Sequence, residues 1–222
     1  MAELTMMSAN KLHNQMRQQI PVFEEIADKC ATILSRIEET PETDATVALK
    51  CVSETLLMLC YINLDLMAAY RQYLSTDTST HYENRQAITK INIVISESYK
   101  KIYGFGERIK ESFWIVKIKK AVDFLGQFYD EYQLIEEDLK LLKSSNVINK
   151  EMRDLAVHYD SDPMEVYKML SALSAEEVTN RCTAYMKVLE KVTAFVNKLL
   201  HLLVVKISEG LNLALAVNVE NG

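Results

Sequence analysis

Apolar residues recur three and four positions apart through most of the chain, which is the spacing of one face of an α-helix. The first such stripe runs from Phe23 to Ile37, and Thr40-Pro41 ends that helix. Residues before Pro21 are polar and rich in methionine, so the pattern assigns them no element. The spacing predicts that the chain is built from amphipathic helices.

The second predicted helix spans about 44–74, and its apolar seam is interrupted only by Asn63. A buried Asn in such a seam more often fixes helix register than binds a ligand. A third helix carries Ile88 to Ile102 and ends at a turn in which Gly104 fits a C-cap. A fourth helix is predicted as one continuous element over about 107–142.

A short helix is predicted to begin at Asn149 and to stop near residues 160–163, where Asp162 caps a second short helix. The last long helix follows Ser174, with a seam of Val178, Cys182, Tyr185, Leu189, Val192, Val196, Leu199 and Leu203. We therefore predict one all-α domain over 1–222, an up-and-down bundle of four to five long helices. The short Asn149 helix precedes the last of them, and residues 208–222 form an apolar tail that packs on the bundle or on a partner.

Composition agrees with a soluble helical protein, since 49% of residues are apolar, 25% are charged, and only five Gly and three Pro are present. A net charge of −6 argues against non-specific coating of nucleic acid but leaves room for a local basic site. The four cysteines are dispersed, which predicts reduced thiols, no zinc site and a cytoplasmic location. The longest apolar run, 56–62, is too short for a membrane span.

Arg153 and His158 are the main candidates for chemistry, because a fixed cation and a titratable imidazole share one short helix. An imidazole with a pKa near 6.5 can move a proton at neutral pH, and a guanidinium can stabilise a developing phosphorane charge. Asp154 and His158 stand at i and i+4, so the carboxylate can steady the imidazole. Arg153 and His158 do not share a stripe, so catalysis requires a second copy to supply the opposing pair.

The chain carries an Arg followed by a polar residue, and a His stands after four intervening positions, near a late helix of an all-helical bundle. This motif resembles that of the HEPN superfamily (higher eukaryotes and prokaryotes nucleotide-binding). The match lies at Arg153, Asp154 and His158, and Tyr159 extends it. The resemblance implies a metal-independent endoribonuclease whose motifs meet across a dimer interface. It implies His158 as general acid or base, Arg153 as phosphorane stabiliser and Asp154 as an orienting group, without cofactor or metal.

A basic stretch over residues 100–120 is the best candidate for RNA contact, with Lys117, Lys119 and Lys120 as binding residues beside Tyr159 of the motif. Trp114 either stacks on bases or lies in the core beneath a solvated helix face, and the sequence leaves both interpretations open. Asp160 and Asp162 place negative charge near the motif, which opposes phosphate binding.

Three functions remain open at this point. The first is a HEPN-like endoribonuclease in bacterial defence or stress, acting as a homodimer on RNA under the control of an antitoxin or other protein partner. The second is a non-catalytic HEPN-like module that binds a protein partner or nucleotide. The third is a structural bundle in which Arg153 and His158 are incidental. None of them requires a membrane.

Overall fold

The computed structural model describes residues 2–74, 81–145, 147–148, 164, 167–168 and 175–220. They form α1 (Ala2–Glu38), α2 (Asp44–Leu74), α3 (His81–Ile102), the 3₁₀-helix η2 (Gly106–Glu111), the π-helix η3 (Trp114–Ile118), α4 (Lys119–Leu125), α5 (Tyr129–Ser144) and α8 (Ala175–Glu220). The described residues contain helices and no strand, which confirms the predicted all-α bundle. The short helices predicted after Asn149 and Asp162 fall mostly outside the described residues.

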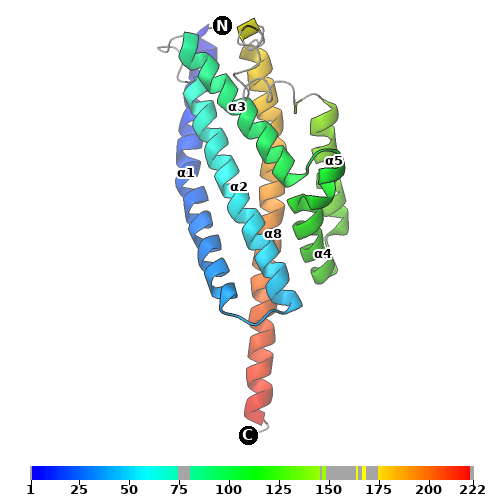
Figure 1. Ribbon diagram of the computed structural model, residues 1–222. Coiled ribbons are helices and arrows are strands. Elements are labelled where there is room, and N and C mark those ends of the chain that lie inside the picture. The colour runs from blue at the N-terminus through cyan, green and yellow to red at the C-terminus, as the bar shows by residue number, and fades with distance from the viewer. Residues whose placement is uncertain are drawn as a thin grey trace.

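The long helices run up and down beside one another, with α2 at the centre of the arrangement (Figure 1). α2 packs against α1, α3, α8 and α4, whereas α5 packs against α8. α1 leans on α2 and makes hardly any close backbone approach to α8. One side of α8 is therefore covered by other helices, and the side toward α1 is not.

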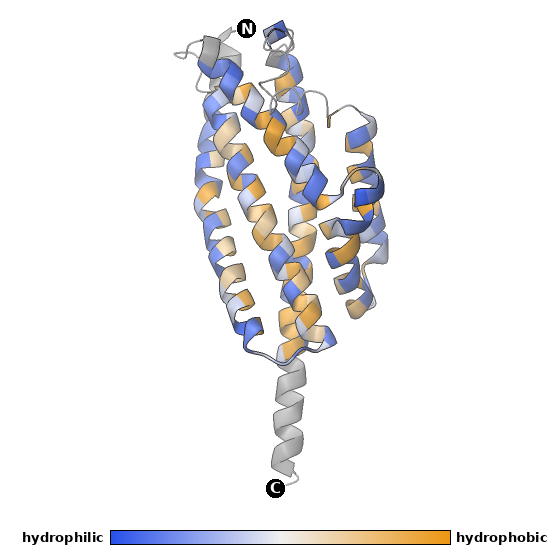
Figure 2. Cartoon of the chain, viewed as in Figure 1, coloured by the Kyte–Doolittle hydropathy of each residue, from blue (hydrophilic) through white to orange (hydrophobic). Residues whose placement is uncertain are grey.

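The seams predicted for the second and last long helices are where the core lies. The observed α2 has the predicted bounds, and all eight predicted seam residues of α8 are buried. Figure 2 shows hydrophobic positions gathered along α2 and α8, while α1 carries mostly hydrophilic ones. Burial of this apolar surface is the main force that holds the helices together.

The first helix is longer than predicted, because α1 begins at Ala2 and continues through Pro21. A proline inside a helix lacks the N–H that would bond to the carbonyl four residues earlier, here Arg17. Pro21 and Arg17 are both exposed, so water can satisfy that carbonyl. The polar residues before Pro21, left unassigned by their pattern, thus form the first half of α1.

The fourth predicted helix is not continuous, and this prediction was wrong. Residues 106–125 pass through a 3₁₀-helix and a π-helix before α4, and α4 ends at Gly126. Gly126 and Phe128 both adopt left-handed backbone angles (φ 69° and 71°), which an α-helix interior does not allow. α5 then starts in a new direction, so the single apolar stripe of the sequence belongs to several short elements.

Gly104 ends α3 as predicted. Its φ is 86°, and its N–H donates to the Tyr99 carbonyl at 3.0 Å, as in a left-handed helix cap. A Cβ at this position would lie 2.8 Å from the Arg108 carbonyl oxygen, so only glycine fits. At the other end of the molecule α8 continues beyond the bundle as a helix to Glu220 (Figure 1), so the residues after Gly210 belong to that helix.

Candidate functional site

The motif residues Arg153, Asp154, His158 and Tyr159 all lie outside the described residues. Their catalytic and binding roles therefore stay predictions. The described residues on either side of the motif show where this segment joins the bundle.

The chain is held in place just before the motif. Val147 and Ile148 are buried, and the Val147 carbonyl accepts hydrogen bonds from Arg181 of α8, at 3.0 Å from Nη2 and 3.3 Å from Nε. Burial lowers the pKa of the Arg181 guanidinium, and the charge of Glu177 acts in the opposite direction. A partly buried guanidinium with a carbonyl acceptor is a firm anchor, since leaving either group unpaired would be costly.

The chain is anchored again after the motif. The Arg85 guanidinium of α3 lies over the ring of Tyr167, 4.3 Å from its centroid, which is a cation–π contact. Arg85 lies near the start of α3, and Arg181 lies near the start of α8. Both helices begin at the same end of the bundle (Figure 1), so Val147 and Tyr167 are both tied to that end.

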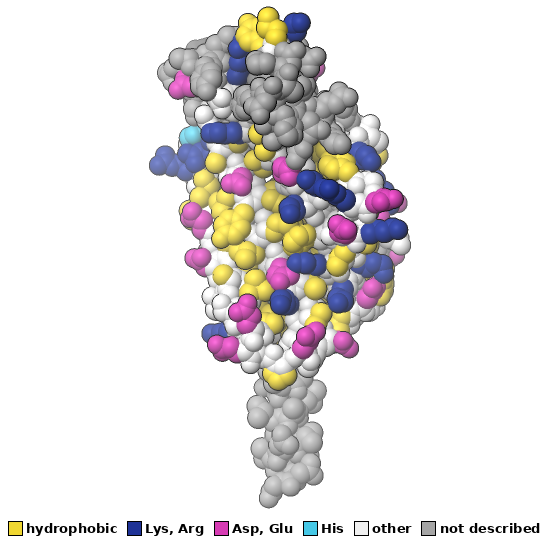
Figure 3. Space-filling view, viewed as in Figure 1, with side chains coloured by type: hydrophobic (Ala, Val, Ile, Leu, Met, Phe, Trp, Pro, Cys, Tyr) yellow, Lys and Arg dark blue, Asp and Glu magenta, His cyan; other side chains and the backbone are white. Residues whose placement is uncertain are grey.

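Two of the three lysines predicted to bind RNA form ion pairs within the protein. Lys117 bonds to Glu54 at 2.5 Å and also lies over the Phe113 ring. Lys119 pairs with Asp123 at 3.1 Å. Lys120 is exposed near the start of α4, and its RNA contact, like that of the other two, stays a prediction. Figure 3 shows acidic and basic side chains interspersed on the face it views.

Trp114 lies in the core, with 1% of its surface exposed. Its ring stacks on Tyr132, with centroids 4.8 Å apart, and meets Phe195 at a tilt. The interpretation of Trp114 as a core residue beneath a solvated helix face is therefore correct, and Trp114 offers no surface for base stacking. Within the part of the chain that the structure describes, its indole N–H has no hydrogen-bond partner.

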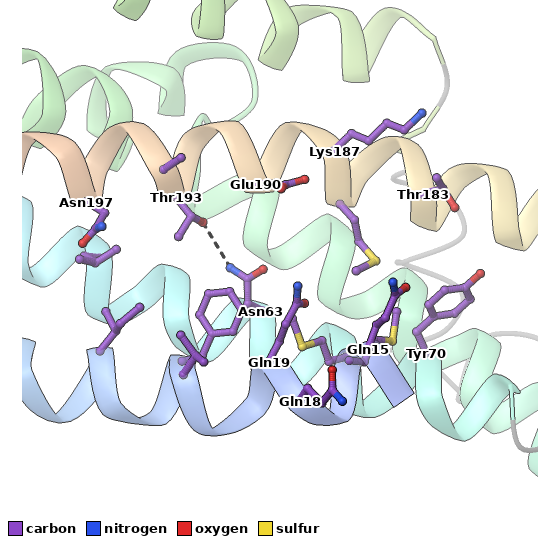
Figure 4. Close-up of a pocket in the computed structure, with 18 residues that line it drawn as sticks. Gln15, Gln18, Gln19, Asn63, Tyr70, Thr183, Lys187, Glu190, Thr193 and Asn197 are labelled. Carbon is purple, nitrogen blue, oxygen red and sulfur yellow. Dashed lines mark hydrogen bonds between the residues drawn. The ribbon is translucent and has the colours of Figure 1, made fainter. Parts of the chain in front are cut away.

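An open hollow of about 670 Å³ lies between α1, α2 and α8, which we call the α1–α8 trough. Its floor is α2 and its walls are α1 and α8 (Figure 4). Residues that matter for its chemistry include Gln15 and Gln19 on α1, Asn63, Met67 and Tyr70 on α2, and Met186 and Glu190 on α8. Hollows of this size commonly bind ligands when a few polar groups converge on an apolar surface.

Two buried polar side chains of α2 lie in the trough floor. The Asn63 amide nitrogen donates to the Leu59 carbonyl at 2.8 Å and to the Thr193 hydroxyl at 3.3 Å. Its carbonyl oxygen accepts no hydrogen bond from the described residues. Tyr70 is 1% exposed, and its hydroxyl has no hydrogen-bond partner among the described residues. The Tyr70 hydroxyl is therefore a buried polar atom without a partner in the described part of the chain, which is an uncommon and costly arrangement.

Two opposing influences act on the pKa of the Tyr70 hydroxyl. Burial raises its pKa, and the nearby hydroxyls of Thr179 and Thr183 on α8 act in the opposite direction. Neither threonine completes a hydrogen bond to Tyr70 in this geometry. The phenol is therefore neutral at physiological pH and keeps its donor and acceptor capacity.

The cysteines are chemically quiet in this fold. Burial raises the pKa of Cys30 to about 11 and the pKa values of Cys60 and Cys182 to about 12, so these thiols stay protonated at neutral pH. Across the described residues, no group of three or more His, Cys, Asp or Glu side chains is arranged to hold a metal ion.

α2 is long and apolar enough to cross a membrane by length and composition alone. Here it is the central helix of the bundle, in contact with α1, α3 and α8, and many of its apolar side chains are buried in those contacts.

Sequence reasoning missed the trough. One wall comes from the N-terminal residues that had no assigned element, and the trough exists only because α1 and α8 stand apart. The signal present in the sequence was Asn63, the one polar residue within an apolar seam. Its carboxamide does tie α2 to α8, as a register-fixing Asn should, and it also faces the trough.

The fold and this geometry define an all-α bundle with an amide-bearing trough on one flank, in which Val147 and Tyr167, on either side of the motif in sequence, contact α8 and α3. No family model, curated protein or solved structure matches the chain.

Proposed function

We propose that this protein is a HEPN-like endoribonuclease that cuts RNA without a metal ion, with Arg153 and His158 as the catalytic pair. The observation that carries the proposal is the Arg-x4-His motif within an all-α bundle. The anchors on either side of the motif support it, because a catalytic segment must be positioned by rigid elements.

The proposed reaction is transesterification within the RNA strand. His158 takes the proton of a ribose 2′-hydroxyl as that oxygen attacks the adjacent phosphorus, or protonates the leaving 5′-oxygen. Arg153 stabilises the phosphorane charge, and Asp154 orients the imidazole. The products are a 2′,3′-cyclic phosphate and a 5′-hydroxyl, and no water or metal is consumed in this step.

Two copies of the motif complete the proposed site, since one imidazole cannot both accept the 2′-proton and donate to the leaving oxygen in the same step. A homodimer with its two-fold axis at the motif end of the bundle would supply the second His158. Lys117, Lys119, Lys120 and Tyr159 are the proposed RNA contacts, and the cytoplasm is the proposed location.

The test is cleavage of a mixed RNA pool by the purified full chain in the presence of EDTA. We expect fragments that end in 2′,3′-cyclic phosphate, and a loss of at least about 100-fold in rate for His158→Ala, since general acid–base catalysis contributes about 10² to 10⁴-fold. Arg153→Ala should fall similarly, because a transition-state charge loses its partner.

His201→Ala is the matched control, because His201 is an exposed histidine on the distal half of α8. It should cut at the wild-type rate, and circular dichroism should show that all variants fold. Equal activity in wild type and His158→Ala would remove the catalytic role, as would a requirement for added metal.

A second function, a non-catalytic module that binds a protein partner or nucleotide, is favoured by the ion pairs of Lys117 and Lys119. These pairs neutralise much of the charge expected to attract RNA. A folded wild-type chain that leaves every RNA in the pool intact selects this function over the first.

A further inference from the structure

α2 carries a second apolar stripe besides its buried seam. Leu57, Tyr61, Leu64 and Ala68 follow one another at helical spacing along the side of α2 that the bundle covers least. Tyr61 is 58% exposed, Ala68 is exposed, and Leu57 and Leu64 are half-buried. Figure 3 shows hydrophobic side chains gathered over α2 in the middle of the face it views. A helix that is apolar on two sides is typically covered on both, so this stripe marks a contact surface.

An open groove between α2 and η3 widens this surface. It is lined by Glu54, Leu57, Met58, Tyr61, Ile62, Asp65, Phe113 and Lys117. We call the α2 stripe together with this groove the α2 face. Its centre is apolar, and the charges of Glu54 and Lys117 neutralise each other in an ion pair.

Two further charges of α2 lie at equal distances from the centre of the α2 face. Lys50 and Asp65 are both exposed, and neither forms an ion pair with a described residue. They lie 15 positions apart in one helix, which is about 22 Å along its axis. Their midpoint falls between Leu57 and Met58. Around the helix, the direction of that midpoint lies about 10° from that of the exposed Tyr61, so it points to solvent.

A two-fold axis through this midpoint makes the α2 face complementary to itself. Such an axis sets the α2 helices of two copies antiparallel and repeats every contact twice. Lys50 of each copy then lies opposite Asp65 of the other, and Leu57 lies opposite Met58. Tyr61 of each copy covers the α2 helix of the other. Two ion pairs therefore flank an apolar centre, which is the arrangement expected of an isologous interface.

α5 shows that an exposed apolar stripe alone does not have this property. Leu134 and Leu141 of α5 are 63% and 60% exposed. Their midpoint falls between Glu137 and Asp138, so two copies that met there would bring four carboxylates together. Like charges that meet in an interface oppose association. The positions of the charges therefore favour a second copy at α2 and disfavour one at α5.

The same charges argue against a lipid surface or a nucleic acid as the occupant. Anionic lipids and RNA attract groups of unpaired lysines and arginines. On the α2 face Lys117 is neutralised by Glu54, and Asp65 adds an unpaired carboxylate.

We propose that the α2 face is an interface through which two copies of this chain associate, with their α2 helices antiparallel. In this pair the ends of the bundles at which α3 and α8 begin lie at opposite ends. The interface is therefore distinct from the two-fold proposed for catalysis, and it goes beyond that function. A surface about 22 Å long and two helices wide is small for a dimer, so we expect a dissociation constant of about 1–100 µM.

The test is sedimentation equilibrium of the full chain over about 1–300 µM, with charge reversal at the two ends of the α2 face. Lys50→Glu and Asp65→Lys should each dimerise at least about tenfold more weakly, because both ion pairs become repulsive. An equimolar mixture of the two variants should recover an affinity within about threefold of wild type, because each reversed charge then faces an opposite charge. Glu137→Lys is the control, since Glu137 is exposed on α5, and it should match wild type.

Tyr61→Ser tests the apolar centre, and it should weaken dimerisation at least about tenfold. Leu134→Ser is its matched control, because Leu134 is similarly exposed on α5, and it should stay within about twofold of wild type. Circular dichroism should show that all variants fold, since each side chain is exposed.

The proposal is overturned if the wild type stays monomeric, if the single charge reversals dimerise like wild type, or if their mixture fails to recover. Equal weakening by Tyr61→Ser and Leu134→Ser also overturns it. These readings are of mass alone, so they stand or fall independently of RNA cleavage.

Discussion

The two sides of α8 face different surroundings within one helix. Toward α3, η3 and α2 it presents Tyr185, Val192 and Phe195, all buried, and Tyr185 bonds to Ser98 of α3. Toward α1 it presents exposed polar residues such as Glu190 and Asn197 beside the trough. The covered side therefore holds the bundle together, and the open side keeps a polar surface that is accessible for binding.

The difference arises from α1. This helix packs on α2 so closely that Cys30 is fully buried, yet it stays apart from α8. A helix that packs on one neighbour leaves its other flank open to solvent, whereas a helix that packs on several neighbours is covered on most of its sides. Measurements of stability and of thiol reactivity test this difference between the covered and open sides of α8.

Phenylalanine truncation should show the largest effect. Phe195→Ala on the covered side should lower the free energy of unfolding by about 3–5 kcal/mol, because the cavity it leaves is enclosed. Phe23→Ala, on the trough side of α1, should cost only about 1–2 kcal/mol, since Phe23 is half-buried and water can enter. Urea unfolding followed by circular dichroism measures both. Equal losses would mean that the trough is closed in solution.

Thiol labelling should show the next largest effect. Cys51 is half-buried and should react with a disulfide reagent first. Cys30, whose pKa is raised by burial from 9.0 to about 11, should carry about 100-fold less thiolate than an ordinary thiol near pH 8. Because Cys30 and Cys60 share the α1–α2 contact, they should become labelled together, before Cys182 in the covered core. Labelling of Cys182 ahead of Cys30 would reverse the assignment of open and covered sides.

The pH dependence of stability follows from the same thiols. The folded state holds them protonated, so their contribution to the free energy of unfolding is complete below about pH 9. It is lost as the pH rises toward 11–12, where the folded thiols of Cys30, Cys60 and Cys182 ionise. Urea unfolding at a series of pH values measures this loss. Stability that increases between about pH 9 and 11 would contradict this account.

Thr193→Val should show the smallest effect. The substitution removes the hydroxyl that accepts from Asn63, while the Leu59 carbonyl keeps its bond to the same amide. We expect a loss of about 1 kcal/mol in the free energy of unfolding, measured by urea titration. Thr32→Val is the control, because Thr32 is exposed on α1 and, among the described residues, bonds to the Asp28 carbonyl four positions earlier in its own helix. A loss no larger than the control would mean that water already satisfies Asn63.

Those elements whose apolar pattern is unbroken could be predicted from the sequence. The seams of α2 and α8 repeat every three or four residues with Asn63 as the sole exception, and both helices were placed correctly. The stripe over 107–142 is equally regular, but Gly126 and Phe128 interrupt the backbone. Helical periodicity indicates which positions share one apolar face, but it does not predict a residue with left-handed backbone angles between two helices.

The two candidate sites, the trough and the motif, also differ in whether a local sequence pattern could predict them. The trough depends on how far α1 stands from α8, a tertiary property that no local pattern encodes. Arg153 and His158 are local in sequence and were found by spacing alone, so their role stays a prediction. Trp114 shows what the sequence leaves open, because only its burial in the structure decides between a core residue and a base-stacking one.

The π-helix η3 has a consequence for length variation in this chain. A π-turn holds one residue more than the α-turn it replaces, and it leaves the flanking turns facing the same way. Val116 is 47% exposed within it, so loss of that one codon would convert the turn to α and keep Trp114 and Ala121 inward. A one-codon loss inside α4 would instead rotate the residues beyond it by about 100°, away from the core.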